Sequence, residues 1–194
     1  MISGIVLAAG TGSRFDGTKQ LEIVDGRPLA QYAIDAAAAA ALGEILVVTG
    51  YEAEAVEAAL RLPAAGRFIR NERYRDGQAT SLAAALHQIA EDSEAAVVLM
   101  ADQPGVTPEV LIAMVARFRA TRGQIVRAAY RDGPGPALLS REIYAVAGHL
   151  HGDVGARVLM ASHPGWVEEV AIEADVPRDV DTREDLPDAG SRAD

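Results

Sequence analysis

Short apolar runs alternate with amphipathic stretches along the first 120 residues. Three apolar runs that end at small or polar residues predict buried strands, at 2–7, 44–49 and 95–100. A fourth, shorter strand is expected at 67–70. The stretches between them carry apolar residues at helical spacing and predict helices at 28–42, 52–61 and 80–91. This alternation predicts right-handed βαβ crossovers and a mostly parallel sheet.

The second half continues the α/β pattern with shorter elements. Thr107 is expected to cap a helix that begins at Pro108 and runs to about residue 121. Further strands are expected at 124–130, 137–139 and 166–172, with helices at 141–149 and 153–162. We expect the late strands to add an antiparallel piece. Since no repeat or linker is evident, one domain is predicted over 1–186, followed by a frayed tail over 187–194.

Composition excludes several functions. The 194 residues include no cysteine, which rules out disulfides, thiolate–zinc sites, iron–sulfur ligation and a cysteine nucleophile. The net charge of −10 argues against nucleic-acid binding. The first residues lack the basic region of a signal peptide, and the longest apolar stretch, 36–42, is far too short to span a membrane. We therefore expect a cytoplasmic protein without a membrane partner.

The segment LAAGTGSRFDGTK at 7–19 carries the most specific chemistry. It follows the first strand, at the edge of an α/β sheet where ligands bind. Gly10, Gly12 and their small neighbours expose backbone N–H groups that can hold phosphate oxygens. Arg14 and Lys19 add two positive charges. The segment therefore predicts a polyphosphate-binding loop.

A glycine-rich loop after a strand has three other interpretations. A Walker A loop fails because Lys19 is followed by Gln20 instead of Ser or Thr. A dinucleotide fingerprint fails because Phe15 stands where its third glycine is required. A plain tight turn with two surface cations stays as an alternative.

Five segments, spread over nearly the whole chain, resemble the molybdenum-cofactor nucleotidyltransferase (MobA-like) family. The loop at 7–19 resembles its LAAGxGxR signature with a nearby lysine. The others are Asn71 with GQATSL at 77–82, ADQP at 101–104, GDVGAR at 152–157 and DVDT at 179–182. The resemblance implies a single-domain, three-layer Rossmann-like (GT-A-like) fold with a mostly parallel sheet. It also implies Mg²⁺ as the cofactor.

Asp102 is the best candidate metal ligand, because it directly follows the most apolar strand. Mg²⁺ typically takes one or two carboxylates together with phosphate oxygens and waters. The alternative for Asp102 is a turn cap before Pro104. The resemblance implies Asp181 as a second ligand, with a cap for the turn at 182–185 as its alternative and Asp179 as a substitute.

The remaining site residues follow from the loop and the resemblance. The candidate catalytic residues are Arg14, Lys19 and Asp102. The candidate nucleotide-binding residues are Leu7, Ala8, Ala9, Gly10, Gly12, Arg14, Lys19, Asn71 and Ser81. The candidate acceptor-binding residues are Gln78, Gln103, Asp153 and Arg157. Asp153 could instead cap a helix, and Arg157 could pair with it four residues on. The four histidines, His87, His149, His151 and His163, show no metal spacing and are expected at the surface or in packing.

The resemblance implies transfer of CMP from CTP to the phosphate of molybdopterin, with release of pyrophosphate. Ala9 favours the cytidylyl branch, since the guanine branch has glycine there. Gly135 departs from the family, which commonly has histidine at that place, and this bears on the acceptor. Other phosphorylated acceptors (sugar, polyol or phospholactate), GTP, or a non-catalytic accessory role stay as alternatives. A transient contact with a molybdoenzyme or its maturation factor is also expected.

Overall fold

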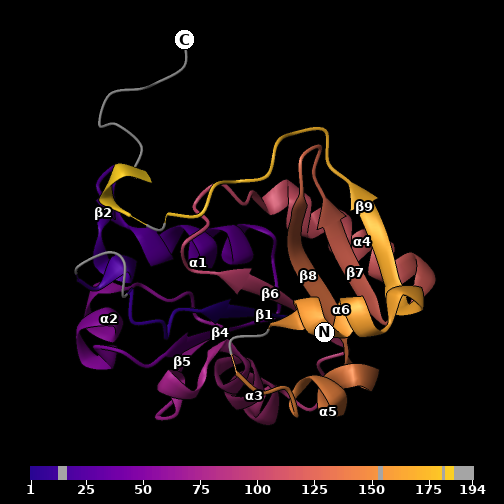
Figure 1. The fold of residues 1–194 in the computed structure, drawn as a ribbon, viewed down its shortest axis with the longest axis horizontal. Helices are drawn as coiled ribbons and strands as arrows, with labels where there is room; N and C mark the ends of the chain where they lie inside the picture. The colour runs from indigo at the N-terminus through magenta and orange to yellow at the C-terminus, as the bar shows by residue number, and fades with distance from the viewer. Residues whose placement is uncertain (13–16, 153–154, 181, 186–194) are drawn as a thin grey trace.

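A seven-stranded sheet forms the centre of the protein (Figure 1). The computed structural model describes residues 1–12, 17–152, 155–180 and 182–185. The strand order is β5-β4-β1-β6-β8-β7-β9. The strands are β1 (Ile2–Leu7), β4 (Glu44–Thr49), β5 (Gly66–Arg70), β6 (Ala95–Met100), β7 (Ile125–Ala129), β8 (Pro134–Ser140) and β9 (Val167–Ala171). The β5, β4, β1 and β6 strands are parallel neighbours, so the predicted single-domain α/β fold with a mostly parallel sheet is confirmed.

Helices cover both faces of the sheet (Figure 1). They are α1 (Leu29–Ala39), α2 (Ala53–Ala59), α3 (Gln78–Gln88), α4 (Pro108–Thr121), α5 (Tyr144–Ala147) and α6 (Ala156–Ser162). Successive strand residues point to opposite faces. Val6 therefore packs in a core with α1, α2 and α4, whereas Ile5 packs in a second core with α3, α5 and α6. Burial on both faces explains why these strands are continuous apolar runs.

The first helix is shorter than its apolar pattern predicts. It begins at Leu29 instead of Pro28, because Pro28 ends the small hairpin of β2 (Ile23–Val24) and β3 (Arg27–Pro28). It ends at Ala39 because Ala41 adopts a left-handed conformation with φ +53°. The amide of Leu42 then bonds to the carbonyl of Ala37 over 3.3 Å, a Schellman-type ending that returns Leu42 to the core.

The late strands are antiparallel only in part. The β8 strand runs antiparallel to both β6 and β7, as expected for this region. The β8 strand thus supplies the expected antiparallel piece, whereas β9 is parallel to β7. The helix predicted at 141–149 is a 3₁₀ turn, η3 (Arg141–Ile143), followed by the four residues of α5. The α6 helix begins at Ala156, three residues later than predicted.

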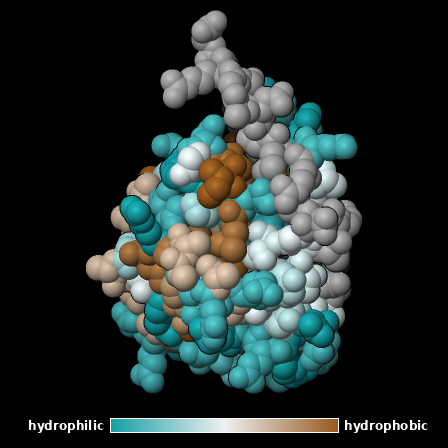
Figure 2. All heavy atoms as spheres, turned by 90° about the vertical axis from the view of Figure 1, so that its left-hand side faces the viewer, coloured by the Kyte–Doolittle hydropathy of each residue, from teal (hydrophilic) through white to brown (hydrophobic). Residues whose placement is uncertain are grey.

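The face that carries β2 and α2 shows a strip of apolar side chains among polar ones (Figure 2). Ile23 of β2 is 62% exposed, more than any other large hydrophobic residue in the described ranges. No helix in the described part of the chain has both the length and the apolar character needed to cross a membrane.

Glu57 connects three elements on one side of the sheet. Its carboxylate accepts hydrogen bonds from Thr49 of β4 (2.8 Å) and from two guanidinium nitrogens of Arg70 of β5 (2.9 and 2.8 Å). The Arg70 hydrogen bond is the main reason that the pKa of this carboxyl lies below its usual range, although burial acts in the opposite direction. The charged form of Glu57 therefore stabilises the fold.

Replacing Glu57 by Gln should lower the free energy of unfolding by about 1 kcal/mol at pH 7. Because the folded-state pKa is lowered, this contribution is present above the unfolded-state pKa and is lost as pH falls through the folded-state value. Urea denaturation at pH 7 and at pH 3 measures both effects. Glu54→Gln is the control, since Glu54 is 89% exposed and 4.0 Å from Arg70. A Glu57→Gln penalty that is equally large at both pH values would contradict the assignment.

Candidate active site

A cavity of about 470 Å³ lies at the carboxyl ends of β1 and β6. The loop after β1, the start of α3 and the residues after β6 line it. Leu7 at the end of β1 is aligned with Met100 at the end of β6. The segments that follow both strands therefore emerge at the same edge, where parallel sheets bind ligands.

Lys19 and Asp102 form an ion pair inside this cavity. The Nζ atom of Lys19 donates to Oδ2 of Asp102 over 2.7 Å, and the two side chains are 12% and 20% exposed. Lys19 is the only lysine in the sequence. Leaving one member of a partly buried pair without the other is costly. A ligand that binds here must therefore satisfy both charges.

Gly10 and Gly12 are glycine for different structural reasons. Gly12 has φ +57°, and a Cβ there would lie 3.0 Å from the carbonyl oxygen of Gly17 and 3.2 Å from Cβ of Lys19. The loop conformation itself therefore requires this glycine. A Cβ at Gly10 would meet only the side-chain nitrogen of Gln20, at 3.9 Å. Gly10 is exposed and lines the cavity, so its lack of a side chain keeps the surface open to a ligand.

The backbone of residues 7–9 continues the sheet into the cavity wall. The carbonyl of Leu7 accepts from the amide that follows β6, the amide of Ala8 donates to β4, and the carbonyl of Ala9 accepts from Tyr51. Leu7 and Ala9 line the cavity, whereas Ala8 packs in the core with α1 on the opposite face. Of these three predicted nucleotide-binding residues, Leu7 and Ala9 are thus among the cavity-lining residues and Ala8 is not.

Asn71 and Ser81 lie at different depths. Asn71 is buried, and its Nδ2 donates to the hydroxyls of Thr80 and Ser81 over 2.9 Å each. Its Oδ1 accepts from the amide of Arg73 over 3.0 Å. Asn71 therefore holds the loop before α3 against that helix, while Ser81 lines the cavity itself.

A second cavity of about 300 Å³ adjoins the first and shares Leu7, Gln78 and Met100 with it. At this boundary, Nε2 of Gln78 lies 2.8 Å from the sulfur of Met100. Gln103 and Arg157 line the second cavity together with Gln78. Three of the four predicted acceptor-binding residues therefore meet in one place. Asp153, the fourth, lies outside the described residues.

Gly135, which also lines the second cavity, is explained by its neighbour Tyr130. A Cβ at residue 135 would lie 2.3 Å from Cε2 of the Tyr130 ring. Tyr130 is 8% exposed, and burial raises the pKa of its phenol. A histidine at 135 would therefore require Tyr130 to leave its packed position. The tyrosine ring takes the space that a side chain at residue 135 would need.

Of the two predicted metal ligands, Asp102 is among the described residues and Asp181 is not. Arg14, a predicted catalytic and nucleotide-binding residue, also lies outside the described residues. The amide of Val180 donates to the carbonyl of Asp102 over 3.0 Å, so the chain just before Asp181 is bonded beside Asp102. Asp179 instead accepts a hydrogen bond from Gln103 over 2.7 Å. Within the described ranges, no three His, Asp or Glu residues are grouped as a complete metal site. Any ion here would need ligand oxygens from elsewhere.

Some lining residues were not predicted from the sequence. Tyr74 and Arg75 line the first cavity, with Nε of Arg75 donating to the Tyr74 hydroxyl over 3.2 Å. No sequence signal marked these loop residues. Arg127 lines the second cavity. Arg127 is a charged residue inside the otherwise apolar run of β7, and this pattern could have marked it as a candidate site residue.

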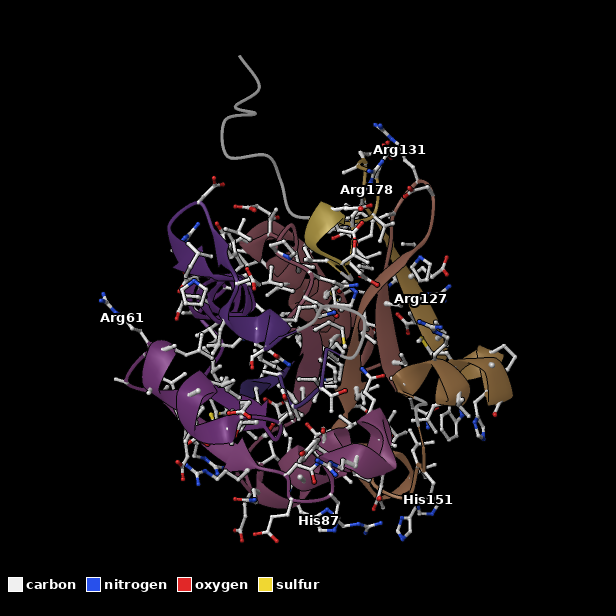
Figure 3. The ribbon with its side chains drawn as sticks, turned by 60° about the vertical axis from the view of Figure 1, so that its left-hand side comes forward. Arg61, His87, Arg127, Arg131, His151 and Arg178 are labelled. Carbon is white, nitrogen blue, oxygen red and sulfur yellow. The ribbon has the colours of Figure 1, made fainter. Side chains whose placement is uncertain are left out.

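The histidines lie away from both cavities. His87, His149 and His151 are exposed, and Figure 3 shows His87 and His151 pointing outward at the edge of the molecule. His163 stacks on Trp166 with ring centroids 3.8 Å apart. These are the surface and packing roles expected for them.

The fold and the position of its cavity define a nucleotidyltransferase superfamily protein. The family model of the MobA-like NTP transferase domain matches residues 4–167, and the chain belongs to this family.

The chain is also similar to three individual proteins. Rv0371c from Mycobacterium tuberculosis H37Rv, solved as a complex with manganese, superimposes with a TM-score of 0.81 and 31% identity over 94% of both chains. The nicotine blue oxidoreductase of Paenarthrobacter nicotinovorans is 30% identical over 196 residues, which cover 95% of this chain and 94% of that protein. The bifunctional protein GlmU of Anaeromyxobacter dehalogenans is 35% identical over 128 residues, 64% of this chain. The chain spans about a quarter of GlmU, 26% of its length.

Gly10→Ala and Gly12→Ala should separate ligand binding from folding. Gly12→Ala should lower stability by about 1–2 kcal/mol, because alanine is strained at φ +57°. Gly10→Ala should leave stability unchanged or raise it by up to about 1 kcal/mol. It should nevertheless weaken triphosphate binding about tenfold. Thermal denaturation and titration with a fluorescent nucleotide measure these effects. Wild-type nucleotide affinity in Gly10→Ala would contradict a close approach of ligand to this loop.

Proposed function

We propose that the protein transfers a nucleoside monophosphate from a nucleoside triphosphate to the phosphate of a small acceptor, with Mg²⁺ as cofactor. The specific reaction we propose is transfer of CMP from CTP to molybdopterin. One observation carries the proposal: the Lys19–Asp102 pair lies in a cavity beside the glycine loop. An adjoining cavity, lined by Gln78, Gln103 and Arg157, offers room for the acceptor.

In this reaction an oxygen of the acceptor phosphate bonds to the α-phosphorus as the bond to pyrophosphate breaks. A phosphomonoester is already an anion near neutral pH, so the step needs no general base. Lys19, with Arg14, would neutralise the charge that develops on the leaving pyrophosphate. Positioning and charge neutralisation dominate the catalysis of such transfers.

Asp102 fits a magnesium ion as a single carboxylate ligand facing the cavity. Mg²⁺ commonly binds one or two carboxylates and completes its shell with phosphate oxygens and water. When bound, the ion supplies charge neutralisation at the phosphates. Asp181 is proposed as its second protein ligand. The manganese complex of Rv0371c supports a divalent cation in this family.

Cytosine is proposed because Ala9 lines the first cavity, where a side chain crowds a purine more than a pyrimidine. Molybdopterin is proposed from the family to which the chain belongs. The product would pass to a molybdoenzyme or its maturation factor through a transient contact. Since Gly135 lines the second cavity and Tyr130 leaves no room for a side chain there, a different phosphorylated acceptor is the nearest variant of this proposal.

An oxidoreductase is a second candidate, because the alignment with nicotine blue oxidoreductase covers nearly all of both chains. One experiment separates the two functions. Pyrophosphate release is measured with CTP, GTP or ATP, Mg²⁺ and each acceptor. In parallel, oxidation of NADH or NADPH is measured with nicotine blue as the electron acceptor, and such oxidation supports the oxidoreductase. Pyrophosphate release that depends on an acceptor supports the transferase. Tight nucleotide binding without either reaction would favour an accessory role.

Lys19→Ala should reduce turnover by about 100-fold or more, because the charge that stabilises the leaving pyrophosphate is removed. Far-ultraviolet circular dichroism should show an unchanged fold. Arg61→Ala is the control, since Arg61 is exposed, points outward (Figure 3) and does not line the first cavity. Wild-type turnover in Lys19→Ala would overturn the role assigned to this residue.

The single lysine allows a direct test of where the nucleotide binds. Amine-directed acetylation can modify only Lys19 and the amino terminus of this chain. CTP with Mg²⁺ should slow acetylation of Lys19 without slowing that of the terminus, as measured by mass spectrometry. Equal rates with and without nucleotide would place the triphosphate elsewhere.

A further inference from the structure

We propose that Arg127 of β7 binds an anionic group at the end of the acceptor that lies away from its reacting phosphate. This inference rests on the proposed function, because it concerns the acceptor of that reaction. Figure 3 shows Arg127 on the half of the molecule formed by the later strands. Neither the glycine loop nor the Lys19–Asp102 pair includes it.

Two arginines, Arg127 and Arg157, and no acidic residue, are among the described residues that line the second cavity. The chain as a whole carries a net charge of −10, so this cluster stands out against an acidic protein. An arginine guanidinium presents a planar fork of N–H groups that suits the two oxygens of a carboxylate or phosphate.

Arg127 has unused hydrogen-bonding capacity. Its position in β7 is aligned with Glu169 in β9, and the two side chains form an ion pair. The Nε atom of Arg127 is buried and has no acceptor among the described residues. A buried donor without a partner is costly, so an oxygen placed beside it would be stabilised. Glu169 thus orients the guanidinium from one side, and Arg127 borders the second cavity on the other side of that ion pair.

Strand register places Arg127 too far from Asp102 to contact the reacting phosphate. Arg127 is aligned with Ala137 on β8, and Ala137 is aligned with Val98 on β6. The Cα atom of Arg127 therefore lies about 12 Å from the Cα atom of Met100, because two strand spacings across the sheet and two residues along β6 separate them. Met100 marks the boundary between the cavities. Arg127 therefore meets the far end of an acceptor whose phosphate points at the first cavity.

The surface of the second cavity between Arg127 and the boundary at Met100 is mostly apolar. Leu82, Val98, Pro136 and Met160 are among the residues that line the second cavity. The hydroxyls of a sugar would find few partners there, and burying them unpaired is costly. The acceptor class that fits is an apolar body with a phosphate at one end and an anionic group at the other. This favours a phosphorylated acceptor other than molybdopterin, whose end away from the phosphate is an uncharged pterin.

A cross-strand ion pair with Glu169 is the purely structural role that Arg127 could have. The chain supplies a matched control for this role. Arg117 pairs with Glu168, the residue before Glu169, over 2.8 Å. Arg117 faces a neighbouring surface cavity that also includes Arg127, but it does not line the second cavity. Arg117→Gln therefore removes a similar ion pair and leaves the proposed contact intact.

Two synthetic phosphates test the inference by isothermal titration calorimetry. Phenyl phosphate and 4-carboxyphenyl phosphate differ only in the carboxylate opposite the phosphate. Each is titrated into the full chain with Mg²⁺, both with and without α,β-methylene-CTP. The wild-type protein should bind 4-carboxyphenyl phosphate about tenfold more tightly than phenyl phosphate, because one hydrogen bond between charged groups contributes about that much affinity. Arg127→Gln should abolish this advantage, and Arg117→Gln should keep it.

Glu169→Gln separates binding from structure, because it breaks the same ion pair from the other side. It should keep the tenfold advantage or increase it, since it removes a competing carboxylate. The inference is overturned if the wild type binds both phosphates equally or neither, or if the advantage survives in Arg127→Gln. It is also overturned if Glu169→Gln, like Arg127→Gln, loses the tighter binding of the carboxylated compound. Thermal denaturation curves check that all variants are folded. Failure of α,β-methylene-CTP to bind would instead count against the proposed function.

Discussion

Two opposite charges held at the ends of adjacent strands set the layout of the site. Lys19 and Asp102 meet at 2.7 Å although they are 83 residues apart in the chain. Their contact depends on the parallel pairing of β1 and β6, which brings the loop after one strand beside the turn after the other. Because neither charge is well solvated, each needs the other or a ligand of opposite charge. A triphosphate with a divalent cation supplies both requirements at once.

The boundary at Gln78 and Met100 divides the binding surface into two cavities of different character. The first has the glycine loop, the ion pair and the hydroxyl of Ser81. The second has an apolar surface and two arginines. Asn71 contributes indirectly, since its buried amide holds the loop before α3 in place. Gly135 lines the second cavity, and the Tyr130 ring packed against it leaves no room for a side chain at that position.

Elements buried on both faces could be predicted well from the sequence. The strands at 2–7, 44–49 and 95–100 have the predicted bounds, because a continuous apolar run has few other stable environments. Helix ends were predicted less well. The end of α1 depends on Ala41, whose left-handed conformation lets Leu42 return to the core, and no local signal marks an alanine for that role. The direction of β9 depends on which strand it lies beside, and its aligned residues in β7 are 42 positions earlier in the chain (Ile125 with Val167, 167 − 125).

The sequence by itself determined the chemistry available at the first cavity: a glycine loop, one lysine and an aspartate after an apolar strand. These signals are local, since each depends on residues within a few positions of a strand end. The tertiary structure decided which groups share a cavity and which point away from it. It pairs Lys19 with Asp102, turns Ala8 to the opposite face and brings Arg127 beside Arg157. Such outcomes depend on strand order and register, which arise from the packing of the whole sheet.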